Sequence, residues 1–108
     1  MALFILLTRL VSEEVKPSFS IGKKEKLVVE KVRAICPEVK WVADYAILGP
    51  YDYLDVFEAP DIETAMKVSA IIRTVAGAHT EVWPATHWKV HEHLMREVAE
   101  SMDESLVA

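Results

Sequence analysis

The side chains that could carry out acid–base chemistry are few, and two of them lie in one aromatic-rich segment. Asp52 directly follows a Gly-Pro-Tyr sequence, and Asp55 lies three residues further on. An odd spacing on a β-strand sends two side chains to opposite faces, so they do not form a ready-made carboxylate pair. Asp52 either accepts hydrogen bonds from local backbone N–H groups in the turn or lines a pocket.

Asp55 shares its expected strand face with Tyr51, Tyr53 and Phe57. A carboxylate among aromatic rings either has a raised pKa, which suits a general base, or is paired with a basic residue and structural. His79 is the other candidate acid or base, because an unperturbed imidazole titrates near neutrality. Its alternative role is that of a solvated histidine at a strand end.

Aromatic residues in the middle of the chain could line a binding cavity. A ligand pocket needs mostly apolar walls and a few convergent polar atoms, but aromatic side chains suit a dimer interface equally well. The candidate ligand-binding residues are Trp41, Tyr45, Tyr51, Asp52, Tyr53 and Trp83.

A histidine cluster near the C-terminus comprises His87, His91 and His93. Residues four apart share one face of a helix, as a metal pair requires. However, His93 turns away from His91, no cysteine is nearby, and the His-Glu-x-x-His order of metalloproteases is absent. With three glycines in total, no phosphate-binding loop is apparent. We therefore expect neither a metal site nor a cofactor.

Length and charge narrow the class of protein. A chain of 108 residues with 52% hydrophobic residues fits one domain. The net charge of −5 works against binding to nucleic acid or to an anionic membrane. The single Cys36 can form no intrachain disulfide, which is typical of the cytoplasm. The apolar run Ala2–Leu7 is too short for a signal peptide or a membrane span.

Hydrophobic periodicity and turn residues predict the order strand, helix, strand, strand, helix, strand and C-terminal helix. In the second strand, Trp41 and Tyr45 are expected on one face and Asp44 on the other. The expected elements are Ala2–Thr8, a helix from a cap at Ser18 or Ser20 to Cys36, Val39–Leu48, Tyr51–Glu58, a helix capped by Asp61 and Gly77, Ala78–Pro84, and His87–Met102.

Right-handed crossovers place both internal helices on one face of the sheet, which predicts an α+β, ferredoxin-like βαββαβ fold with a four-stranded antiparallel sheet. The domain is expected over residues 1–86, followed by an amphipathic helix and tail over 87–108. The strands are apolar on both faces, so the helix-free face must be covered. A second copy related by a two-fold axis or the C-terminal helix could cover it.

The segment Leu48–Asp61 resembles the hairpin of the GYD-domain family, with Gly49, Tyr51 and Asp52 in its signature. Glu58–Asp61 is similar to the family's Glu-Ala-Pro-Asp start of the following helix, and His79–Ala85 to its last strand. The resemblance covers about residues 2–86 and implies a dimeric α/β barrel. That superfamily includes small monooxygenases, isomerases, decolorising peroxidases and ligand-sensing domains.

Three functions remain open on the sequence alone. The first is a homodimer, or higher homo-oligomer, that binds or senses a small apolar or aromatic molecule. The second is a cofactor-free enzyme of monooxygenase or isomerase type, with His79 or Asp55 as base. The third is a structural or interaction module. The small number of aligned titratable groups favours the first.

Overall fold

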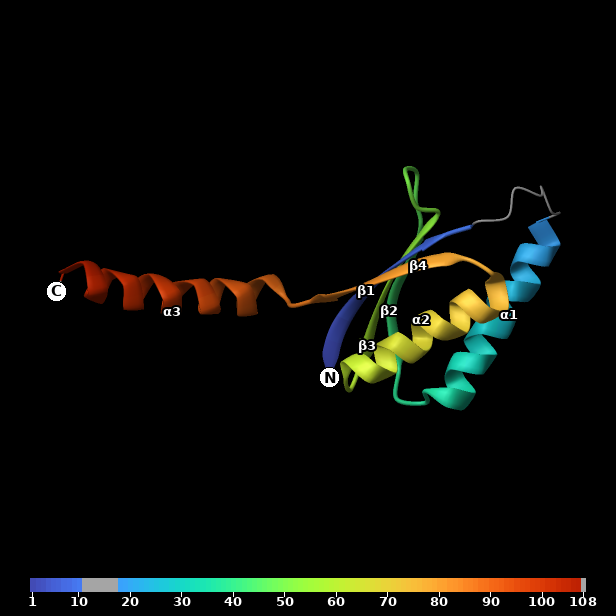
Figure 1. The fold of residues 1–108 in the computed structure, drawn as a ribbon, viewed down its shortest axis with the longest axis horizontal. Coiled ribbons are helices and arrows are strands. Elements are labelled where there is room, and N and C mark those ends of the chain that lie inside the picture. Colours follow the sequence, from blue (N-terminus) through green and yellow to red (C-terminus); the bar gives the residue numbers. More distant parts are fainter. Residues whose placement is uncertain (11–17, 108) are drawn as a thin grey trace.

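A computed structural model describes residues 1–10 and 18–107, with side chains for 1–10 and 22–102. The element order is the predicted one, with a helix after the last strand (Figure 1). The cap expected at Ser18 or Ser20 lies outside the described side chains. The elements are β1 (Ala2–Arg9), α1 (Ser18–Ile35), β2 (Lys40–Ala46), β3 (Tyr53–Ala59), α2 (Ile62–Ala76), β4 (His79–Ala85) and α3 (Trp88–Val107).

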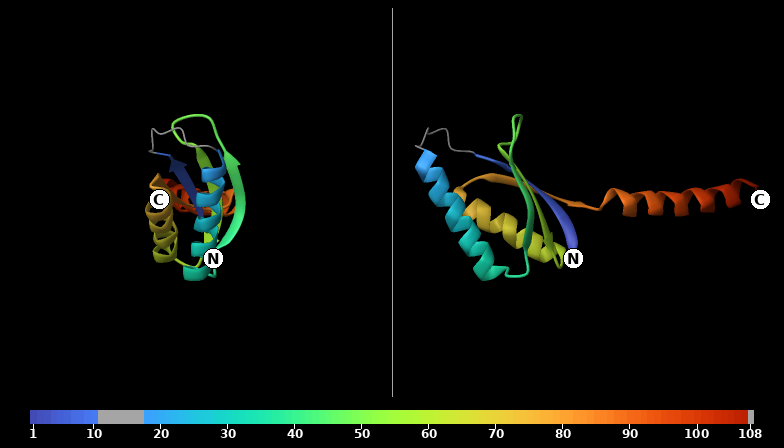
Figure 2. Two further views of the ribbon diagram at one scale, coloured as in Figure 1. Left: turned by 90° about the vertical axis from the view of Figure 1, so that its right-hand side faces the viewer. Right: turned by 180° about the vertical axis from the view of Figure 1, so that it is seen from behind.

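The four strands form one antiparallel sheet in the order β2-β3-β1-β4. Helices α1 and α2 lie together on one face of this sheet, and α3 projects away from it (Figure 2). This confirms the ferredoxin-like βαββαβ architecture with its C-terminal helix. Of the described helices, none is long and apolar enough to cross a membrane.

The core lies between the sheet and the two helices. Phe4 of β1 and Phe57 of β3 are opposite each other in the ladder, and their rings stack with centroids 5.5 Å apart. Val32 of α1 and Val68 of α2 close the core from the helical side, and all four side chains are almost fully buried. Their burial supplies the hydrophobic free energy that fixes both helices on this face.

Local signals set the bounds of α2 as predicted. The Asp61 carboxylate accepts a hydrogen bond from the backbone N–H of Thr64 at 2.7 Å and one from its hydroxyl group at 2.6 Å. These bonds satisfy donors that a helix N-terminus leaves free. Gly77 ends the helix in the left-handed conformation, with φ of 63°, which glycine adopts without steric cost.

A β-bulge in β2 corrects the predicted alternation of that strand. Trp41 pairs with Phe57, but Ala43 pairs with the next residue of β3, Val56, so that Val42 is an extra residue. Paired residues share a face, whereas neighbours along β3 point to opposite faces. The bulge therefore places Trp41 on the helical face and Tyr45 on the other. The expectation that these two aromatic residues share a face was wrong.

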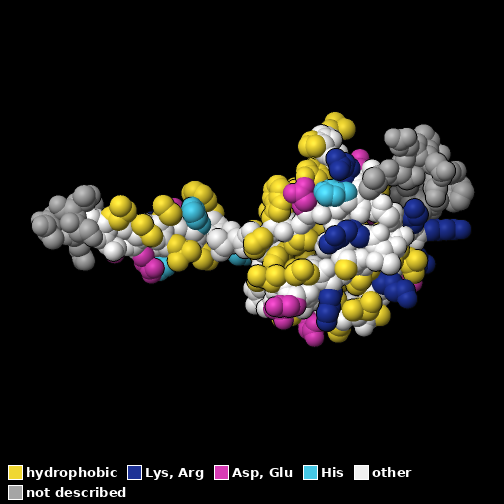
Figure 3. Space-filling view, in the orientation of Figure 1, with side chains coloured by type: hydrophobic (Ala, Val, Ile, Leu, Met, Phe, Trp, Pro, Cys, Tyr) yellow, Lys and Arg dark blue, Asp and Glu magenta, His cyan; other side chains and the backbone are white. Residues whose placement is uncertain are grey.

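The opposite face of the sheet, here called the open face, is apolar and is not covered by α3. Its strands expose a patch of hydrophobic side chains on the flank nearest α3 (Figure 3). All of its apolar members except Leu7 are at least partly exposed. Ladder register assigns the open face nine apolar residues, Leu3, Ile5, Leu7, Ala43, Tyr45, Leu54, Val56, Trp83 and Ala85, together with Arg9, Lys40, Glu58, His79 and Glu81.

Candidate functional site

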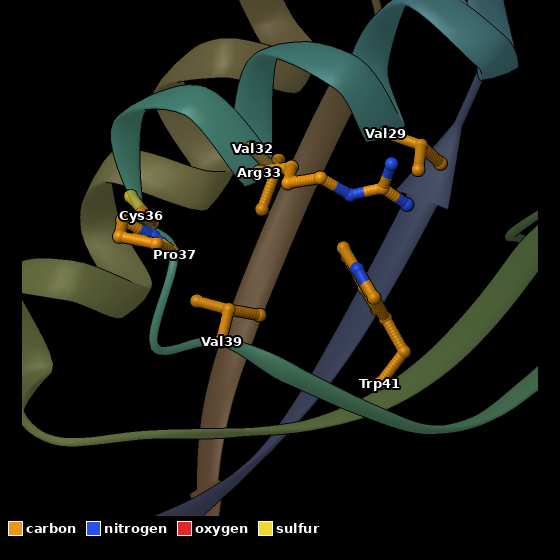
Figure 4. A pocket seen from close by; sticks show the side chains of 7 residues that line it. All are labelled: Val29, Val32, Arg33, Cys36, Pro37, Val39 and Trp41. Atoms are coloured by element: carbon orange, nitrogen blue, oxygen red, sulfur yellow. The ribbon is translucent and has the colours of Figure 1, made fainter.

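A small pocket lies between α1 and the start of β2, with a volume of about 200 Å³. Six of its seven lining residues are of apolar type, the exception being Arg33, and Trp41 forms one wall. Arg33 extends across the pocket towards Val29 (Figure 4). The lining residues are Val29, Val32, Arg33, Cys36, Pro37, Val39 and Trp41. Such a lining, apolar with one cationic group, suits a small apolar molecule that carries a polar or anionic end.

Cys36 lines this pocket directly after the end of α1, and its side chain is buried. Burial raises its pKa; Lys67 opposes this effect and Glu38 adds to it. A thiol that is kept protonated is a poor nucleophile, because the thiolate is the reactive form. We therefore assign Cys36 to the apolar lining and not to covalent chemistry.

A pair of carboxyl groups lies next to Trp41 on the helical face of the sheet. Asp44 and Asp55 are directly opposite each other in the β2–β3 ladder. Burial is the largest cause that raises the pKa of Asp55. Together with a side-chain hydrogen bond with Asp44 and the negative charges of Asp44 and Glu25, it raises this pKa to about 7. A carboxyl group with this pKa can both donate and accept a proton near neutral pH.

Asp52 holds the hairpin to the end of β1. Its carboxylate accepts a 2.7 Å hydrogen bond from the backbone N–H of Leu10, 42 residues away in the sequence. Its backbone N–H donates to the carbonyl oxygen of Thr8, and its carbonyl oxygen accepts from Ile47, both at 2.9 Å. The carboxylate was expected to accept a hydrogen bond from local backbone in the turn. It instead accepts a long-range hydrogen bond from Leu10, directly after β1, and this bond orients it.

The other predicted site residues do not form one cluster. Tyr53 lies on the helical face with Asp55, whereas Tyr45 and Trp83 lie on the open face. The prediction that Trp41, Tyr45, Tyr53 and Trp83 line one cavity from a single face was therefore wrong. Tyr51 lies in the turn before β3 and is half-buried.

His79 also lies on the open face and is well separated from Asp55 by the sheet itself. Its Nε2 is 3.8 Å from Oε2 of Glu81, whose Oε1 accepts a 3.3 Å hydrogen bond from Nε1 of Trp83. Since His79 and Asp55 are on opposite faces, they cannot act on the same substrate atom within one chain.

The histidines of α3 lie along one exposed helix. The His91 ring packs against Trp88 with centroids 5.4 Å apart, and Nε2 of His93 is 3.0 Å from Oε1 of Glu97. Across the side chains that the structure describes, no group of three metal-ligating residues comes together. That His87 and His91 are not a metal site stays a prediction.

Sequence reasoning missed Asp44 and Arg33 as site residues. Asp44 could have been found by counting outward from the Gly49–Pro50 turn, because residues at equal distance from a hairpin turn oppose each other. This count pairs Asp44 with Asp55, as the ladder does. Arg33 gave no signal, since an arginine on a helix is usually solvated.

Comparison with solved structures shows the same fold at low sequence identity. The leucine response regulatory protein LrpA of Mycobacterium tuberculosis is 14% identical, with a TM-score of 0.56 over 80% of this chain and 51% of that chain. The match thus spans about half of the regulator. FFRP-DM1 is 24% identical, with a TM-score of 0.49 over 80% of this chain and 100% of that chain.

A hypothetical protein from Pyrococcus horikoshii is 22% identical, with a TM-score of 0.48 over 81% of this chain and 92% of that chain. Comparison with the curated proteins gives no match. The GYD domain, as a family profile, matches residues 4–95, which includes the hairpin, the α2 start and the last strand. The chain therefore belongs to the GYD-domain family, a family of the ferredoxin-like, dimeric α/β-barrel fold.

Proposed function

We propose that this protein is a sensing or binding module for a small aromatic or aliphatic molecule, which it holds in the pocket between α1 and β2. The observation that carries the proposal is the lining of that pocket, in which apolar side chains and the Trp41 ring surround space that one guanidinium group borders. A cavity of about 150 Å³ is large enough for benzene, so the pocket fits a single ring.

The Arg33 guanidinium favours a ligand with a carboxylate. Arginine binds carboxylates through two parallel hydrogen bonds, and this geometry also fixes the orientation of the ligand. Arg33 lies across the pocket, beside Val29 and above the Trp41 ring (Figure 4). We therefore expect the ring of an aromatic acid against Trp41 and its carboxylate at Arg33.

Ligand-observed NMR with a fragment set tests this proposal. Benzoate-like fragments should bind, and Trp41→Leu should abolish their binding. Trp83→Leu is the matched control, because it changes the same residue type on the opposite face and should leave binding unchanged. Arg33→Gln should weaken carboxylate fragments about tenfold or more and leave neutral rings unaffected. A bound set that is indifferent to Trp41→Leu contradicts the proposal.

A second candidate function rests on the carboxyl pair. Because the pKa of Asp55 is about 7, this residue could take up and return a proton in a cofactor-free reaction of the isomerase or monooxygenase type. Asp55→Asn should then abolish turnover while fragment binding persists. If the wild type turns over a bound compound and Asp55→Asn keeps both the turnover and the binding, Asp55 is not the base.

We also propose that the protein is a homodimer whose open faces pack against each other. The open face exposes an apolar patch that water disfavours, and a two-fold related copy buries both patches at once. Light scattering at micromolar concentration should give twice the chain mass of 12.2 kDa. Ile5→Arg, which places a charge on the open face, should shift the mass to that of one chain. A wild-type protein that stays at 12.2 kDa would contradict this assembly.

A further inference from the structure

Helix α3 has one apolar and one polar side along its described length. At 100° per residue, its apolar side chains fall within an arc of roughly 160°, and every one of them is exposed, from 47% for Leu94 to 70% for Trp88. The polar arc holds the charged side chains and His93. The apolar arc comprises Trp88, Val90, Leu94, Met95, Val98 and Met102, and the polar residues His91 and Ser101 also fall within it.

No part of the described chain covers this apolar side. The helix points away from the sheet and from α1 and α2, so that the molecule is 65 Å long but only 30 Å by 18 Å across (Figure 1). Helices in proteins are stabilised mainly by tertiary packing of an apolar face and less by helix propensity. The apolar side of α3 therefore needs a partner surface.

The start of α3 lies at the border of the open face. Ala85, the last residue of β4, pairs with Leu3 and belongs to the open face, and α3 begins at Trp88. Stacked sheets lie about 10 Å apart, and a helix rises about 10 Å in two turns. A second copy that packs on the open face would therefore lie beside the first turns of α3.

The open face by itself is smaller than the interface of a stable dimer. Four strands of seven residues cover a plane of about 450 Å², whereas a stable interface buries about 800 Å² on each partner. An apolar strip along α3 from Trp88 to Met102, about 20 Å long and 10 Å wide, makes up more than half of the difference. A second copy that covers both surfaces thus comes within the range of an ordinary dimer.

Charge argues against a membrane as the partner of α3. Its polar arc carries Glu92, Glu97 and Glu100 against Lys89 and Arg96, and the whole chain has a net charge of −5. Helices that lie on anionic bilayers are instead rich in lysine and arginine on the polar side. The partner that fits α3 is therefore an apolar surface of a protein.

We infer that α3 is an arm that packs its apolar side on a second copy of this chain and extends the dimer interface formed by the open faces. This inference rests on the proposed dimer. Each arm holds the other copy beyond the sheet, so dissociation requires both the sheet contact and the arm contacts to break.

Sedimentation of the full chain with one substitution at a time tests the arm. Val98→Glu puts a charge at the centre of the apolar arc and should raise the dimer dissociation constant about 100-fold or more, while the hydrogen-exchange protection of the sheet amides stays unchanged. Arg96→Glu adds the same residue on the polar arc and should change the dissociation constant less than about threefold.

A photo-crosslinking residue at position 95, in mixed 15N-labelled and unlabelled protein, should give labelled–unlabelled crosslinks. A Val98→Glu dimer as tight as the wild type, or crosslinks within one chain only, would overturn the arm and leave the sheet-face dimer standing. A wild-type monomer would overturn both. Co-sedimentation of the wild type with phosphatidylserine vesicles that Val98→Glu abolishes would overturn the arm in favour of a membrane contact.

Discussion

Asp44 and Asp55 oppose each other across the β2–β3 ladder, on the face of the sheet that carries the helices. Burial of Asp55 and the opposed acid Asp44, which is unfavourable when both are charged, together keep a proton on Asp55 up to near neutral pH. The pair lies next to Trp41 on this face, but neither carboxyl group is among the residues that line the pocket.

The raised pKa of Asp55 predicts that this residue destabilises the fold as pH rises. The folded state holds its proton up to a pKa of about 7, whereas the unfolded chain releases it near pH 4. The contribution of Asp55 to the free energy of unfolding is therefore complete below pH 4 and is lost as the pH rises through 7. Asp55→Asn should raise the free energy of unfolding at pH 8 by about 2 kcal/mol, allowing for solvent screening, and leave it unchanged at pH 4.

Urea unfolding between pH 4 and pH 8 measures this effect. Asp61→Asn is the control, because hydrogen bonds from Thr64 lower the pKa of Asp61. The stabilisation by Asp61 is present above its unfolded pKa and is lost only in acid. The Asp61 variant should therefore keep the decrease in the free energy of unfolding between pH 4 and pH 7. If the free energy of unfolding of Asp55→Asn decreases between pH 4 and pH 7 as it does in the wild type, Asp55 is not the cause of this decrease.

Ser69 and Thr80 form the buried polar contact between α2 and β4. Their hydroxyl oxygens are 2.6 Å apart, and both residues are almost fully buried. Ser69→Ala leaves the Thr80 hydroxyl without this partner and should cost about 1–3 kcal/mol. Thr80→Val should cost less, because Oγ of Ser69 still accepts a 3.3 Å hydrogen bond from Nη2 of Arg73. The double variant should cost less than the sum of the two, as a thermal-unfolding double-mutant cycle would show. Additive costs would mean that the hydroxyls act independently.

Two glycines should respond to the same substitution with opposite sign. Gly77 has a φ of 63°, so Gly77→Ala should destabilise the protein by about 1 kcal/mol. Gly22 lies in α1 with no atom within 4 Å of an added Cβ, so Gly22→Ala should stabilise it by about 0.5–1 kcal/mol. Melting temperatures of the two variants that move in the same direction would contradict this reading.

The Asp52 carboxylate should control the mobility of the hairpin. Because it accepts the backbone N–H of Leu10 at 2.7 Å, Asp52→Ala should lose one charge-assisted hydrogen bond and about 1.5–3 kcal/mol. Hydrogen exchange should accelerate at Leu10 and Ile47, while the amide of Phe57 keeps its protection. Asp52→Asn, which still offers an oxygen acceptor, should retain most of the stability.

The sequence by itself determined the element order, the fold class and the ends of α2. These features depend on local patterns: apolar runs and alternation for strands, Asp61 and Gly77 for the ends of α2, and the handedness rule for the layers. Each needs only neighbouring residues or a general rule of chain geometry. The family signature around Gly49, Tyr51 and Asp52 is equally local.

Only the tertiary structure decided which face each site residue occupies. One extra residue in β2, Val42, reverses the alternation and separates Trp41 from Tyr45, because a shift of one residue exchanges the two faces of a strand. The same bulge brings Asp44 to the side of Trp41 and Asp55. A bulge depends on pairing with a neighbouring strand, so the pattern within β2 carries no signal for it. Likewise, the long-range bond from Leu10 to Asp52 exists only because β1 ends beside the hairpin.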